Sequence, residues 1–269
     1  MTIAAALVVG AAFADMESSI VGYNTTTLAQ LNYKAFAVHF SDVAAPTAGI
    51  PINQLVTVSP LATQPAFGGT MDQIWRWDTS VNKWAKYGYQ KPARSGTAAW
   101  RKYDANSNTF SELTSADVVL PGETFLYFRG NSATATLTLS GAVKEFTAQP
   151  TYTIPQLNYQ FVARPWPIGF KLSELSQIAT WSSLATQPAF GGTMDQIWRW
   201  DTSVNKWAKY GYQKPARSGT AAWRKYDAST NSFSELTDAD AIGDDEGFLY
   251  FRGNSATLTL TFKPLQSAE

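Results

Sequence analysis

The sequence contains no cysteine, so neither disulfide bonds nor thiolate metal sites can form. It has one histidine, His39, and a single imidazole cannot supply a His-rich metal site or a Cys/His pair. Charged residues make up only 16% of the chain, and the 21 basic side chains balance the 21 acidic ones. A net charge of zero provides no global field that would attract nucleic acid or an anionic membrane. We therefore expect no nucleic-acid partner.

Only one apolar run suggests targeting, and it opens the chain. Residues 3–13 are small and apolar without interruption, and Ala12-Phe13-Ala14 before Asp15 fits the small-x-small rule of signal peptide cleavage. The run is too short to span a bilayer as a helix, and a basic segment before it is missing. We expect residues 1–15 to be a signal peptide or an N-terminal extension. The mature chain would then be extracellular or on the cell surface, with no membrane span.

An internal duplication organises the rest of the chain. Residues 61–105 recur without a change at residues 184–228, and the likeness continues more loosely on both sides. Recent sequence exchange between the copies would explain this identity, and so would a need for both copies to present the same surface. The duplication predicts two tandem units, at residues 16–140 and 141–269, each long enough to bury its own core.

Apolar and polar residues alternate with a period of two along most of both copies, which is typical of β-strands. In the segment 73–78 this alternation places Trp75 and Trp77 on one face and Ile74 and Arg76 on the other. A turn at residues 78–82 then leads into a second aromatic strand at residues 84–89. We expect about seven or eight strands in each unit, as in a sandwich. The predicted fold is all-β, with two tandem, internally duplicated, immunoglobulin-like β-sandwich domains.

Two resemblances follow from these segments. The double glycine Gly68-Gly69, the pair Trp77-Asp78 and the trailing Trp84 resemble the core of a kelch repeat, which implies hairpin geometry alone because a propeller needs several such blades. The overall layout is similar to exported bacterial surface and fibre proteins made of tandem β-sandwich modules, some of which polymerise by strand exchange. That resemblance concerns architecture only.

Catalytic chemistry has little support. The glycine pair before Thr70 lacks the lysine of a phosphate-binding loop and leads into a strand. Paired carboxylates could hydrolyse glycosides, but Asp72, Asp78 and Asp104 all lie at strand starts or turns, where aspartate is favoured for local hydrogen bonds. We therefore predict that the protein is not an enzyme and uses no cofactor.

The acidic segment 238–246 could offer carboxylate oxygens to Ca²⁺, a hard cation. Its spacing does not fit an EF-hand, and the first copy has only Asp117 and Glu123 in this region. A solvated acidic loop is the preferred interpretation. The candidate calcium ligands are Asp238, Asp240, Asp244 and Asp245.

Charge is sorted along the chain. Each identical block holds seven basic and three acidic residues, so the remainder of this neutral chain is acidic. Basic side chains next to Trp and Tyr favour cation–π stacking, although the rings could equally stabilise their own hairpin. The predicted aromatic and basic patch consists of Trp75, Arg76, Trp77, Trp84, Lys86 and Trp100, with their copies Trp198, Arg199, Trp200, Trp207, Lys209 and Trp223.

Two functions fit these features. The first is a structural subunit of an extracellular filament or surface layer, which self-assembles head-to-tail as β-strands from one chain add to the next. The alternative is a carbohydrate-binding or adhesive module whose exposed Trp and Tyr rings stack on glycans. For the first function, residues 140–142 act as a short joint between the units. The predicted assembly residues are Ile20, Val21, Tyr23, Leu258, Leu260 and Phe262.

Overall fold

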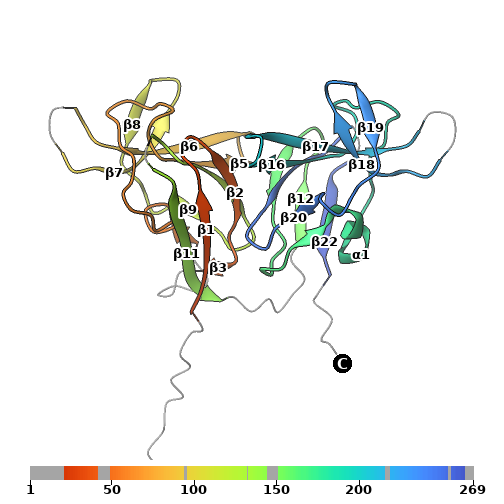
Figure 1. Ribbon diagram of the computed structural model, residues 1–269, viewed down its shortest axis with the longest axis horizontal. Coiled ribbons are helices and arrows are strands. Elements are labelled where there is room, and N and C mark those ends of the chain that lie inside the picture. The colour runs from red at the N-terminus through yellow and green to blue at the C-terminus, as the bar shows by residue number, and fades with distance from the viewer. Residues whose placement is uncertain are drawn as a thin grey trace, which may run out of the picture.

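The structure is a computed structural model that describes residues 21–41, 49–93, 96–131, 133–143, 151–215, 219–253 and 256–263. The predicted leader at residues 1–15 and the assembly residue Ile20 lie outside these ranges. The described chain is all-β apart from one short helical segment, which confirms the predicted class (Figure 1). Within these ranges no helix is long and apolar enough to cross a membrane.

The first unit, residues 21–143, is built from antiparallel sheets. Its three-stranded sheet has the order β1 (Val21–Leu28), β11 (Ala135–Val143), β3 (Phe40–Ser41). Its six-stranded sheet has the order β2 (Tyr33–Ala37), β10 (Thr124–Phe128), β5 (Gln73–Asp78), β6 (Lys83–Gln90), β7 (Ala99–Asp104), β8 (Thr109–Ser111). Two short strands, β4 (Ile50–Pro51) and β9 (Val118–Val119), form a separate ladder.

The second unit, residues 151–263, repeats this arrangement. The three-stranded sheet has the order β12 (Thr151–Ile154), β22 (Leu258–Phe262), β15 (Ala179–Trp181). The six-stranded sheet has the order β13 (Tyr159–Val162), β21 (Phe248–Phe251), β16 (Gln196–Asp201), β17 (Lys206–Gln213), β18 (Ala222–Asp227), β19 (Ser232–Ser234). The short ladder pairs β14 (Phe170–Lys171) with β20 (Ala241–Ile242). A 3₁₀ turn (Leu172–Glu174) and the helix α1 (Leu175–Ile178) follow β14, where the sequence predicts one or two helical turns.

In each unit the core lies between the two larger sheets, which gives a β-sandwich-like architecture. The first core joins Leu137 and Leu139 of β11 to Phe36, Ile74 and Tyr127 of the six-stranded sheet. The alternation prediction is confirmed because Ile74 lies in this core, while Trp75 and Trp77 belong to a separate cluster on the opposite face. The strand β5 is therefore apolar on both faces.

The joint between the units differs from the prediction. Gly141 and Ala142 pair with Gly22 and Val21 inside the β1–β11 ladder, so this sheet continues to Val143, past the predicted boundary. Residues 140–142 are therefore part of a strand and cannot act as the short joint. The prediction was wrong because Ser-Gly-Ala has the composition of a linker. In the structure, Gly141 occupies a strand position where a Cβ atom would overlap the backbone of Ser41.

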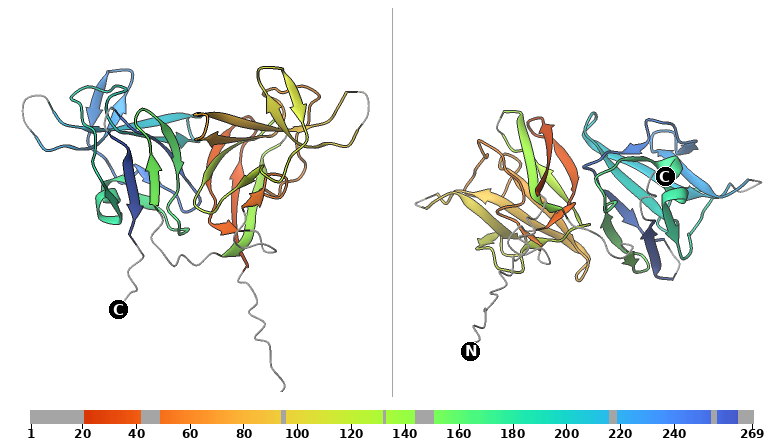
Figure 2. Two further views of the ribbon diagram at one scale, coloured as in Figure 1. Left: turned by 180° about the vertical axis from the view of Figure 1, so that it is seen from behind. Right: turned by 90° about the horizontal axis from the view of Figure 1, so that it is seen from below.

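The two units lie side by side, and their six-stranded sheets meet in the middle of the molecule (Figures 1 and 2). β2 contacts β16 and, reciprocally, β13 contacts β5, about an approximate two-fold axis. This arrangement of the units is isologous, whereas the contact predicted between chains was head-to-tail. The joint therefore gives no template for a head-to-tail contact between chains.

Candidate functional site

The predicted aromatic and basic patch is divided between two environments. Trp100 and Trp223 are only 6% and 8% exposed and belong to the cores of their own units. Trp75, Trp77 and Trp84 lie on the opposite face of the six-stranded sheet. Trp100 and Trp223 therefore do not share a surface with the other predicted patch residues, because β7 directs Trp100 inward while β5 and β6 direct the other rings toward the second unit.

The remaining rings form an interface between the units, which we call the seam. Its centre is fully buried, and partly buried rings from both units surround it. The buried residues are Ala35, Leu126, Phe161 and Leu249, and the surrounding rings are Tyr33, Trp75, Trp77, Trp84, Tyr159, Trp198, Trp200 and Trp207. These tryptophans, which the alternative function would expose to glycans, are instead partly buried between the two six-stranded sheets.

Two ring contacts across the seam form a reciprocal pair. The Tyr33 and Trp200 ring centroids are 5.0 Å apart, and those of Trp77 and Tyr159 are 5.6 Å apart. Edge-to-face and tilted ring pairs of this kind stabilise an interface beyond the area that they bury. The identical blocks supply the tryptophan of each pair, so both copies use the same rings for the same contact.

The basic members of the patch are occupied within their own units. The Lys86 Nζ lies 4.2 Å from the Trp75 ring centroid, and Lys209 repeats this cation–π contact with Trp198 at 4.2 Å. Arg76 forms a salt bridge of 3.1 Å with Glu123. The remaining arginine, Arg199, donates to the carbonyl oxygen of Ala241 and lies 3.8 Å from the Asp201 carboxylate.

Several polar contacts across the seam come from β2 and from the residues that follow it. Lys34 forms a 2.7 Å salt bridge with Asp245 of the second unit, and the Ala37 N–H donates to the Asp245 carbonyl. The ring nitrogens of His39 lie 3.2 Å from the Pro165 carbonyl oxygen and 3.0 Å from that of Asp244. Burial lowers the pKa of His39. The single histidine therefore serves unit pairing in this structure.

The candidate calcium ligands do not converge. Asp238 pairs with Lys171, Asp245 with Lys34, and the Asp244 carboxylate accepts from the Gly169 N–H. Asp240 is buried and accepts from the Tyr210 hydroxyl and from Lys225. No group of three potential metal ligands occurs among the described residues. The four carboxylates are separate because short strands and turns direct each one toward its own partner.

The predicted assembly residues have contrasting positions. Leu258, Leu260 and Phe262 are fully buried in β22, which is the central strand of its sheet and pairs with β12 and β15. The prediction that this strand offers an edge is wrong, because its two neighbours already occupy both of its edges. By contrast, Val21 and Tyr23 belong to β1, a terminal strand of its sheet, and Tyr23 is 75% exposed.

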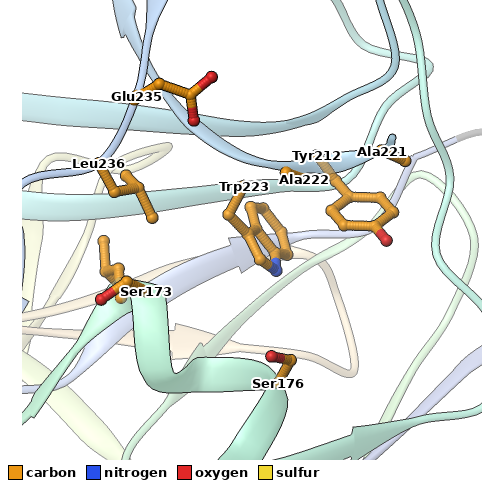
Figure 3. Close-up of a pocket in the computed structure, with 9 residues that line it drawn as sticks. Ser173, Ser176, Tyr212, Ala221, Ala222, Trp223, Glu235 and Leu236 are labelled. Carbon is orange, nitrogen blue, oxygen red and sulfur yellow. The ribbon is translucent and has the colours of Figure 1, made fainter. Parts of the chain in front are cut away.

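The second unit also has a surface pocket of about 320 Å³ that the sequence did not predict. Tyr212 and Trp223 form its aromatic side, with ring centroids 5.4 Å apart. Figure 3 shows Trp223 in the centre, with Tyr212 on one side, Leu236 on the other, and Ser176 of the helical segment below. The pocket is lined by Leu172, Ser173, Ser176, Tyr212, Ala221, Ala222, Trp223, Glu235 and Leu236.

A sequence signal for the seam did exist. Alternation normally predicts one buried and one polar face, but the segment 73–77 has apolar residues on both. Such a strand is covered on both sides. No family model, curated protein or solved structure matches the chain, so its function is inferred from its own geometry.

Proposed function

We propose that the protein is a non-enzymatic structural subunit of an extracellular filament or cell-surface layer, and that it self-assembles through the free edge of β1. As part of this proposal, the two units are immunoglobulin-like modules, and the protein is similar in layout to exported tandem β-sandwich proteins. The apolar segment at residues 3–13 would direct its export.

The observation that carries the proposal is the edge of β1. This strand is eight residues long, contains no charged residue and no proline, and pairs only with β11 among the described strands. Soluble proteins usually protect such an edge with lysine, proline, a bulge or a covering segment. An unprotected edge of this length offers main-chain donors and acceptors to a strand from another chain. The corresponding strand β12 has four residues and is a shorter second edge.

The test places charge on the edge. In the doubly substituted Tyr23→Lys/Thr27→Lys protein, both lysines occupy exposed positions of β1. We expect this variant to remain folded and to lose polymers, because an added strand would have to bury the lysines beside its own backbone. Electron microscopy and light scattering of the full chain over a range of concentrations measure the effect.

A matched control uses the cross-strand partners of the same two positions. Ser140 pairs with Tyr23 and Thr136 with Thr27, and both partners are exposed but lie on the central strand β11. The Ser140→Lys/Thr136→Lys variant should therefore polymerise like the unmodified protein. Unmodified protein that stays monomeric at high concentration, or an edge variant that polymerises as well as the control, would contradict the proposal.

The alternative function, carbohydrate binding, has a specific observation in its favour. The pocket beside Trp223 has an aromatic side, serine hydroxyls and the exposed carboxylate of Glu235. Ring faces pack against the C–H face of a sugar, and the polar groups around them bind its hydroxyls. A volume of about 320 Å³ is at the small end of small-molecule sites and fits one or two sugar units.

The first unit provides a matched control for this site. Tyr89 and Trp100 repeat the aromatic pair, with centroids 5.6 Å apart, but no helix is present among the described residues of that unit. Saturation-transfer NMR with methyl glycosides of glucose, galactose, mannose and N-acetylglucosamine should give a signal that Tyr212→Ala removes and Tyr89→Ala retains. Absence of a signal from all four glycosides, or equal losses in the two variants, would exclude sugar binding at this pocket.

A further inference from the structure

The seam joins two units of related sequence, so each seam residue has a counterpart in the other unit. Ala35 pairs with Leu126 in the first unit, and Phe161 pairs with Leu249 at the same places in the second. All four are buried in the seam. The two leucines are alike, whereas the other pair combines the smallest side chain with a large ring. The centre of the seam is thus filled by a small residue from one unit and a large residue from the other.

Counterparts meet each other where the approximate two-fold axis passes through the seam. Thr124 and Gly247 each precede the Phe-Leu-Tyr-Phe strand of their unit. A Cβ atom at Gly247 would lie 2.7 Å from the Thr124 Cβ and would overlap the rest of that side chain. Two threonines could not occupy these positions together. A seam with threonine at both of these positions would therefore have a steric clash at the axis.

Polar contacts differ between the two reciprocal places in the same way. On one side, Lys34 bonds to Thr26 of its own unit and pairs with Asp245 of the other. On the other side, the Tyr152 hydroxyl of the second unit lies 2.6 Å from the Gly122 carbonyl oxygen of the first. Gly122 stands where the second unit has Asp245, and Gln160 stands where the first has Lys34. Each side therefore has its own chemistry.

We infer that the seam selects pairing between a first unit and a second unit and rejects pairing between two like units, with Thr124 and Gly247 as the main determinants. Two first units would bring two threonines together, and each Lys34 would face Gly122 in place of Asp245. Two second units would oppose two Phe161 rings and leave space between two glycines. The kind of partner that fits each face is thus the opposite unit. Specificity arises as much from these conflicts as from the favourable contacts.

This inference explains the pattern of sequence change. The Tyr33–Trp200 and Trp77–Tyr159 ring contacts are reciprocal and take their tryptophans from the identical blocks. By contrast, Thr124 and Gly247 meet each other, lie outside those blocks and differ. A symmetric contact requires the same residue in both copies, and a contact between counterparts requires complementary ones. The selectivity of the seam is independent of the proposed assembly through β1, since the seam and β1 are on different faces of the molecule.

The test exchanges the two axis residues in the full chain. Gly247→Thr alone should separate the units, because a second threonine side chain cannot fit. Adding Thr124→Gly restores one threonine and one glycine across the axis, and this double variant should close the seam again. The Thr124 hydroxyl has no hydrogen-bond partner among the described atoms, so the Thr124→Gly change removes no hydrogen bond. Thr124→Gly by itself should leave the seam closed.

Distances between spin labels report the outcome, because the chain has no cysteine of its own. Ala105→Cys and Ala228→Cys place labels on the exposed turns before β8 and β19, at the two ends of the molecule (Figure 1). One narrow distance distribution is expected for the parent, the Thr124→Gly variant and the double variant, and a broad one for Gly247→Thr. A narrow distribution in Gly247→Thr, or a broad one that Thr124→Gly fails to reverse, would overturn the inference.

Discussion

In each unit, one buried aspartate connects loop segments to the core through hydrogen bonds and a salt bridge. Asp72 is fully buried, forms a 2.7 Å salt bridge with the equally buried Arg129, and accepts from the backbone N–H groups of Ala62 and Gly130. Arg129 also donates to the Pro60 carbonyl oxygen. Burial raises the pKa of Asp72, and these donors oppose that shift. Asp195 and Arg252 repeat the arrangement in the second unit.

Removing one partner of this pair should be costly. We expect Asp72→Ala to lower the free energy of unfolding by about 3–5 kcal/mol, because it leaves Arg129 as a buried, uncompensated charge. Urea unfolding followed by circular dichroism measures the loss. Glu112→Ala is the control. The Glu112 carboxylate is largely exposed, so its salt bridge with Arg101 should contribute about 1 kcal/mol or less. Equal losses in the two variants would refute the assigned role.

A second carboxylate gives the protein a predictable response to acid. Burial alone would raise the pKa of Asp117, but hydrogen bonds from Thr114, Lys102 and Tyr87 outweigh it and lower the pKa below its ordinary value of 3.8. A lowered folded-state pKa contributes stability that is present above the unfolded-state pKa and lost as the pH falls through the folded-state value. Asp240 has the same donors in the second unit.

We therefore expect Asp117→Asn/Asp240→Asn to be less stable than the unmodified protein at pH 7. The difference should shrink as the pH falls below about 4, because the unmodified protein then loses the contribution that the variant lacks. Thermal unfolding across this pH range measures the convergence. Glu235→Gln, which removes an exposed carboxylate, should run parallel to the unmodified protein. Parallel curves for the double variant as well would show that these aspartates do not set the acid response.

At the scale of elements, sequence patterns predicted where strands form better than they predicted which strands pair with each other. The β5–β6 hairpin forms as the alternation and turn residues predict, and Asn82 adopts the left-handed conformation that its turn requires (φ 52°). By contrast, β22 looked like a free C-terminal strand and is the centre of its sheet. Alternation gives the two faces of a strand but carries no information about its edges. Pairing of edges depends on segments distant in sequence.

At the scale of the whole molecule, the seam determines which role the aromatic residues have. Trp75 and Trp77 could have been an exposed binding surface or a covered one, and local sequence does not distinguish these cases. The packing of one unit on the other partly buries both rings. The edge of β1, the pocket beside Trp223 and a pocket beside Trp84 are among the surfaces that stay accessible.

The sequence by itself determined the all-β class, the duplication, the faces of strands such as β5, and the helical turns at residues 172–178. These features depend on side-chain periodicity and local conformational preference, which neighbouring residues encode. Only the tertiary structure decided that Leu258 lies in a central strand, that Gly247 meets Thr124, and that Asp238, Asp240, Asp244 and Asp245 stay apart. Those facts depend on contacts between residues far apart along the chain, which periodicity does not specify.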